Sequence, residues 1–143
     1  MPLNSFLIRF YNFLERNRLF FIYLSLCVYW VTLFILTTIP IESVPRFFDA
    51  QDKIEHLIAY FLLAWLLAFT LHFQRKNKFL SKNYTYITII FIVFYAAIDE
   101  IHQIFIPGRY CDLIDWIADF IGGIFGVLFV KWIINTRIKL FVK

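Results

Sequence analysis

The sequence predicts an all-α integral membrane protein, a bundle of four transmembrane helices. Hydrophobic residues make up 62% of the 143 residues, and only 17% are charged. Soluble domains carry about 45–50% apolar and about 25% charged residues. A chain of this length is too small to bury so much apolar surface in a core of its own. The apolar residues fall into four runs, each close to the roughly 20 residues that a spanning helix needs. We therefore expect lipid to be the solvent for most of the chain.

The four runs predict spans over residues 19–39, 54–73, 84–106 and 113–134, all within one domain of residues 1–143. Each run ends at a stop signal for a helix. These signals are, in order, Pro40, the basic stretch 75–78, Pro107 with Gly108, and Lys131 with Arg137. The first run is too long for a cleaved signal peptide and follows a charged leader, so we expect it to persist as an uncleaved helix.

The leader before the first span has a pattern of its own. From Leu3 to Phe13, apolar side chains recur at helical spacing, and Arg9 and Arg16 fall elsewhere on the helix. This pattern is typical of an amphipathic helix that lies on the inner surface of the membrane. A flexible leader is the alternative.

Lysine and arginine are distributed unevenly between the predicted loops. Of the 14, 11 lie in the leader, in the loop between the second and third spans, or at the C-terminal end. The positive-inside rule therefore places both termini in the cytoplasm. Because the basic residues lie between apolar runs, we interpret the net charge of +4 as a topology signal and as contacts to anionic lipid, and expect no nucleic-acid partner.

Under this topology, the acidic residues gather in the outer half of the membrane. Glu15 is the exception, and Glu42, Asp49 and Glu55 are expected to be solvated at the rim. Asp99 and Glu100 would lie about 10–12 Å below the outer end of the third span, at 1.5 Å per helical residue. A charged side chain at such depth costs about 2.5–3.5 kcal/mol even on the lenient insertion scale. These groups therefore require pairing partners or a water-filled pocket.

Helical spacing shows which polar groups can meet. In the second span, Asp52, His56 and Tyr60 are four residues apart and share one stripe, with Lys53 beside it. The third span contributes further polar residues at spacings of three and four, namely Asp99, Glu100, His102 and Gln103. We expect these groups to form one polar layer.

The fourth span brings aspartates to the same layer. Asp112, Asp115 and Asp119 lie on a face that continues into Gly122, Gly123 and Gly126. Small residues at this spacing let transmembrane helices pack closely. In the outer turn before this span, Arg109 is expected either to neutralise the carboxylates or to clamp an anionic substrate group.

Two segments resemble sequence elements of the VanZ-like membrane proteins. The segment from Asp52 to Tyr60 resembles the family's DKxxHxxxY element. The segment from Asp99 to Gly122 is similar to its second element, ExxQxxxPxR followed by DxxDxxxNxxG. Order and spacing agree over roughly residues 50–126. Asp119 departs from the pattern, because it stands where the family usually has Asn.

This resemblance implies a multi-pass protein of the bacterial cytoplasmic membrane, and the topology inferred from the basic residues places its site on the extracytoplasmic side. The family's founding member is associated with resistance to teicoplanin, a glycopeptide antibiotic that acts at the outer face of the cell envelope. Membrane lipids and a lipid-linked envelope precursor are the partners that the resemblance implies. It names no reaction, and the oligomeric state is left open.

A first functional hypothesis is an intramembrane enzyme or an enzyme-like binding protein. Glu100 would act as general base or acid, because a partly buried carboxyl can exchange a proton near neutral pH, and His56 would be its partner. Lys53 and Arg109 would hold an anionic head group, and Gln103 would orient substrate or water. The aspartates of the fourth span would balance the charge, or would hold a divalent metal together with His56 and Glu100. No metal-type spacing such as HExxH supports a metal more sharply.

Two other hypotheses stay open. In a structural or modulatory protein, the polar network would only fix the helix ends against one another. About seven carboxylates against two or three cations is more than such pairing needs. Transport or proton translocation is the third hypothesis and the least favoured, because the polar residues stop in the outer half and no internal repeat is present.

Overall fold

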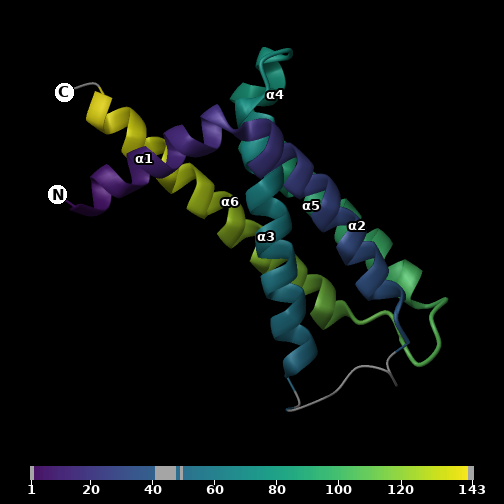
Figure 1. Cartoon of the computed structure of the whole chain (residues 1–143). Coiled ribbons are helices and arrows are strands. Elements are labelled where there is room, and N and C mark those ends of the chain that lie inside the picture. The colour runs from purple at the N-terminus through teal and green to yellow at the C-terminus, as the bar shows by residue number, and fades with distance from the viewer. Residues whose placement is uncertain (1, 41–47, 49, 142–143) are drawn as a thin grey trace.

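The computed structural model describes residues 2–40, 48 and 50–141, and this part of the chain contains helices and no strand (Figure 1). Four helices are long and apolar enough to cross a membrane. They are Leu19–Thr38, Gln51–Phe73, Tyr84–Gln103 and Leu113–Arg137. The prediction of an all-α protein with four such helices is confirmed.

The N-terminal part of the chain is nearly continuous helix. Helix α1 (Pro2–Arg16) is followed by a π-helical segment, η1 (Leu19–Leu24), which continues as α2 (Ser25–Thr38). Helix α2 ends because Ile39, with φ −74° and ψ 127°, is extended. That conformation is the one a residue before a proline prefers, and Pro40 follows.

Helix α3 (Gln51–Phe73) leads through a short helix, α4 (Lys78–Lys82), to α5 (Tyr84–Gln103), and α6 (Leu113–Phe141) completes the chain. The turn before α4 is stabilised by the Asn77 side chain, which accepts hydrogen bonds from the N–H groups of Phe79 and Leu80. Both termini lie at the end of the bundle that carries α4, and α3 and α6 begin at the opposite end (Figure 1).

Helix α5 ends at Gln103, whereas apolar residues continue to Ile106. The N–H groups of Phe105 and Ile106 donate to carbonyls three residues earlier, which is the tighter bonding pattern that often ends a helix. Gly108 then adopts φ 75°, a left-handed conformation that glycine allows without steric cost. The turn brings the chain back toward the start of α6.

Helices α3 and α6 pack closely, and glycines make this possible. A Cβ atom at Gly122 would overlap the carbonyl oxygen of Leu57, and one at Gly126 would overlap that of Phe61. The core beside this contact is built from α2, α3, α5 and α6, with the buried residues Leu26, Leu33, Tyr60, Leu63, Ala64, Leu66, Ile92, Ala96 and Val127. Gly122 and Gly126 therefore let α3 and α6 pack closely, as the sequence predicted.

Helix α1 packs against the C-terminal ends of α3 and α6. Leu7, Tyr11 and Leu14 are buried there in a second apolar cluster. The hydroxyl of Tyr11 lies 2.8 Å from Nε2 of His72, and the guanidinium of Arg137 lies 4.0 Å above the Tyr11 ring. The leader is thus helical and docked on the bundle; its contact with the membrane surface stays a prediction.

Candidate functional site

The polar residues predicted from the sequence meet at the end of the bundle opposite α4. They converge because α3 and α6 begin at this end, whereas α5 ends there. Several of them are buried, namely Asp99, Glu100, Gln103, Asp115 and Asp119. Burial of so many polar groups in a helical membrane bundle is costly unless they satisfy one another.

Lys53 neutralises the outer part of this cluster. Its Nζ atom lies 2.6 Å from a carboxylate oxygen of Asp112, 2.6 Å from one of Asp115 and 3.1 Å from one of Asp52. The hydrogen bond from Lys53 holds the pKa of Asp112 below its usual value. Three carboxylates share one ammonium, which is the pairing expected for a structural network. The other role expected for Lys53, holding an anionic head group, stays a prediction.

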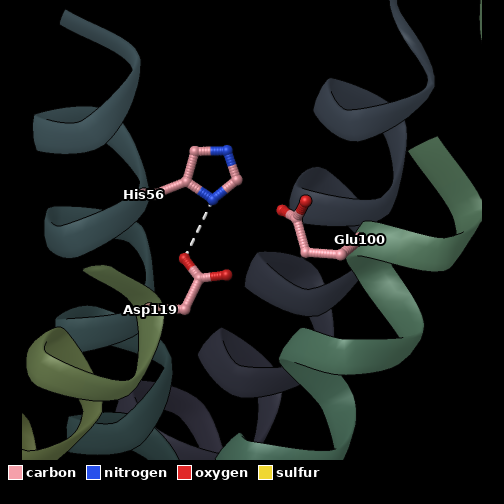
Figure 2. A group of neighbouring side chains, drawn as sticks. All are labelled: His56, Glu100 and Asp119. Atoms are coloured by element: carbon pink, nitrogen blue, oxygen red, sulfur yellow. Dashed lines mark hydrogen bonds and ion pairs between the residues drawn. The ribbon is translucent and has the colours of Figure 1, made fainter. Parts of the chain in front are cut away.

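The deeper part of the cluster joins three helices. Nδ1 of His56, on α3, lies 2.9 Å from Oδ1 of Asp119, on α6, and the carboxyl of Glu100, on α5, faces the same space (Figure 2). One potential ligand atom from each of the three lies within 4.8 Å of the other two. The sequence hypothesis paired His56 with Glu100; in the structure its hydrogen-bond partner is Asp119.

Glu100 is held by its own neighbours. Its Oε2 atom accepts a 2.8 Å hydrogen bond from the backbone N–H of Asp112, and its Oε1 atom accepts a longer one, 3.4 Å, from Nε2 of Gln103. Next to it in sequence, Asp99 accepts a 3.2 Å hydrogen bond from the hydroxyl of Tyr60. These bonds fix the end of α5 against α3 and the start of α6.

Arg109 occupies a place that the sequence did not predict. Its Nε and one terminal nitrogen donate to the carbonyl oxygens of Ile39 and Leu36, at 2.8 and 3.2 Å, and the other terminal nitrogen lies 3.4 Å from Oε1 of Gln103. The last carbonyls of a helix lack partners within it and carry partial negative charge. Arg109 therefore caps α2, and among the described residues it forms no ion pair with a carboxylate.

A groove of about 510 Å³ lies beside this cluster. It is bounded mainly by α2 and α3, and its lining residues are Tyr29, Leu33, Leu36, Thr37, Ile39, Glu55, His56, Ile58, Ala59, Tyr60, Asp99 and Arg109. A second, much smaller opening of about 30 Å³ lies between the starts of α3 and α6 and the turn that contains Gly108, Arg109 and Tyr110. It can hold a single water molecule. His56 and Arg109 line both spaces.

The contribution of α2 was missed in the sequence analysis. Tyr29 donates a 2.9 Å hydrogen bond to the carbonyl oxygen of Ala59, and Thr37 lines the groove. The hydroxyl groups of Tyr29 and Thr37, inside an otherwise apolar run, were the sequence signal that could have indicated this contribution. Of the expected rim charges, Glu55 is exposed, while Glu42 and Asp49 lie outside the described residues.

A comparison with protein families gives a match that covers both of the sequence segments that contribute to the site. The VanZ/LLP1 family model matches residues 20–135, a range that contains every residue of the polar cluster and of the groove. No curated protein and no solved structure matches the chain. The family match covers most of the chain, from the start of η1 to near the end of α6. The chain belongs to the VanZ/LLP1 family and is a membrane protein.

Proposed function

We propose that this protein binds a lipid-linked component of the bacterial cell envelope, with the lipid tail in the groove between α2 and α3. The groove carries the proposal, because apolar side chains form most of its wall and His56, Asp99 and Arg109 gather toward one end. Its volume of about 510 Å³ falls in the range of about 300–1,000 Å³ that is usual for ligand pockets. An amphiphile matches this arrangement of apolar and polar surface.

The chemistry of the polar end supports a particular kind of head group. Lys53 is shared by three carboxylates, and Arg109 is bonded to backbone carbonyls. The other polar side chains that line the groove are mainly hydrogen-bond acceptors, such as the carboxylates of Glu55 and Asp99. A head group rich in hydroxyls or amines, as in a lipid-linked sugar, therefore fits better than a bare anion.

Binding is better supported than catalysis. Glu100, the candidate general base, is only 2% exposed, and each of its carboxyl oxygens accepts a hydrogen bond. His56 lines the groove and is only partly buried, so its imidazole is placed to exchange a proton with a bound head group. Catalysis would require Glu100 to become uncovered.

Paired tryptophan substitutions test the groove. Ile58 lines it and is 51% exposed, while Ile90 on α5 is 57% exposed and is not among the lining residues. We expect one lipid class to copurify with the wild-type protein above its share in the membrane, to be retained by Ile90→Trp and to fall about tenfold in Ile58→Trp, equivalent to about 1.4 kcal/mol. Mass spectrometry of extracted lipids measures this. Equal lipid profiles in all three proteins would contradict the proposal.

The same pair of variants separates binding from the structural alternative. The network around Lys53 and the capping of α2 by Arg109 favour that alternative, because both tie helices together. The proposal also includes a role in teicoplanin tolerance, as the family resemblance implies. If expression raises tolerance, Ile58→Trp should abolish the gain and Ile90→Trp should keep it; a purely structural protein would respond alike to both.

We further propose that both termini are cytoplasmic and that the polar end faces the extracytoplasmic side. Cys111, in the outer turn, is free and exposed, and the other cysteine, Cys27, lies within the span formed by η1 and α2. A membrane-impermeant maleimide should label intact cells at Cys111, and Cys111→Ser should remove the label. Labelling that appears only in inside-out vesicles would reverse the assigned orientation.

A further inference from the structure

Three buried side chains from three helices surround one small space. Ligand-capable atoms of His56, Glu100 and Asp119 all lie within 4.8 Å of one another. A metal ion bound at about 2.0–2.2 Å holds its ligand atoms no more than roughly 4.4 Å apart. Small side-chain rotations are therefore enough to bring all three atoms onto one ion.

One oxygen in this space lacks a partner. Asp119 is fully buried, and its Oδ1 atom faces His56, but its Oδ2 atom accepts no hydrogen bond from the described part of the chain. Figure 2 shows this second oxygen turned away from His56, on the side of Glu100. Buried carboxylate oxygens are rarely left unsatisfied, because the loss of hydration is not repaid. The free oxygen therefore points to a missing ligand.

The charges around the space point the same way. Lys53 is committed to Asp52, Asp112 and Asp115. Neither Glu100 nor Asp119 has an ion pair with a lysine or arginine among the residues that the structure describes. Two carboxylates in a membrane interior are expensive without cations, and one imidazole can neutralise at most one of them. A divalent cation would neutralise both.

We propose that His56, Glu100 and Asp119 form a binding site for a divalent transition-metal cation, such as zinc or manganese. Imidazole nitrogen favours zinc and its neighbours, whereas carboxylate oxygen also suits manganese. Three protein ligands leave a coordination position for water or another molecule, as in catalytic zinc sites. This inference goes beyond lipid binding and does not depend on what occupies the groove, because metal binding can be measured in the absence of a lipid ligand.

Asp119 is the residue on which the proposed site depends most, because it is fully buried and has one oxygen without a hydrogen bond in the described part of the chain. An asparagine, which the resembling family element usually has here, would offer one oxygen and no charge. Asp112 and Asp115 were equal candidates from the sequence, but the structure assigns them to Lys53. The Asp119→Asn variant is therefore the sharpest test, since it changes the ligand and keeps the size of the side chain.

The test uses the full-length protein in detergent, stripped with a chelator, incubated with Zn²⁺ or Mn²⁺ and desalted before metal analysis by mass spectrometry. We expect about one equivalent of metal per wild-type chain, as three ligands form one centre. Loss of a supporting group around a metal ligand weakens binding by about 10–100-fold, so Asp119→Asn, which replaces a charged ligand by a neutral amide, should weaken it by about 100-fold. Asp52→Asn removes a carboxylate at the same end of the bundle and should leave binding unchanged.

A spectroscopic measurement covers the case in which Asp119→Asn does not fold. Pulsed electron paramagnetic resonance of the Mn²⁺-loaded wild-type protein should detect one directly bound imidazole nitrogen, and His56→Gln should remove that signal. The proposal is overturned if the wild-type chain retains no stoichiometric metal, if Asp119→Asn and Asp52→Asn bind equally well, or if Mn²⁺ shows no nitrogen coupling.

Discussion

Gly126→Ala should destabilise the bundle by about 3 kcal/mol, whereas Gly123→Ala should cost about 1 kcal/mol or less, the two ends of the range for overpacking. A Cβ atom at Gly126 would meet the backbone of Phe61 and Trp65 as well as the side chain of Ala64. Backbone can yield only if α3 and α6 move apart. At Gly123 the atom that stands in the way is Cγ2 of the buried Ile92 side chain, so one side chain on α5 has to shift and α3 and α6 need not move apart. Thermal unfolding in detergent measures the difference.

The neighbouring position extends this prediction to the polar site. A Cβ atom at Gly122 would press on the backbone of Leu57, which follows His56 directly. Gly122→Ala should therefore lower the unfolding temperature about as much as Gly126→Ala, and should also lengthen the contact between His56 and Asp119. Small and equal changes in the unfolding temperature of all three alanine variants would show that α3 and α6 can move apart at little cost. That result would contradict the close packing described above.

Lys53→Met should destabilise the protein by about 3 kcal/mol, the lower end of the range for removing one partner of a buried ion pair. The loss arises because Asp52, Asp112 and Asp115 would share a small volume without a cation. We take the lower end because the Lys53 side chain is 27% exposed. Chemical or thermal unfolding of the purified variant gives the value.

Two further variants identify the cause of that loss. Lys53→Arg keeps the charge and should retain most of the stability. Combining Lys53→Met with Asp112→Asn and Asp115→Asn removes the unpaired charges, and should recover a large part of the loss. If the triple variant is as unstable as Lys53→Met alone, the lysine acts through packing of its alkyl chain and not through its charge.

The membrane class and the helix count could be predicted because their signals are local. The apolar runs of α3 and α5 are long enough by themselves to indicate spanning helices. The stripe Asp52, His56 and Tyr60 likewise follows from the period of a single helix. Helical spacing therefore predicted which residue types lie together at this end of the bundle, without knowledge of any contact between helices.

Which groups pair across helices could not be predicted in this way. His56 was expected to pair with Glu100, but it faces Asp119, and the choice depends on the rotation of α3 against α5 and α6. Arg109 was expected to meet carboxylates because only side chains can be compared in a sequence. Two of its three acceptors are the backbone carbonyls of Leu36 and Ile39, which every residue type possesses, and the third is the side-chain oxygen of Gln103.

By itself, then, the sequence determined a four-span helical membrane protein with most of its acidic residues and His56 at one end, because hydropathy and helical period belong to single segments. The tertiary structure alone decided that Lys53 serves three aspartates, that Asp119 faces His56 with one oxygen free, and that α2 helps to form a groove. These features depend on the distance and rotation between packed helices. Close contacts at Gly122 and Gly126 set that geometry, and no single segment encodes it.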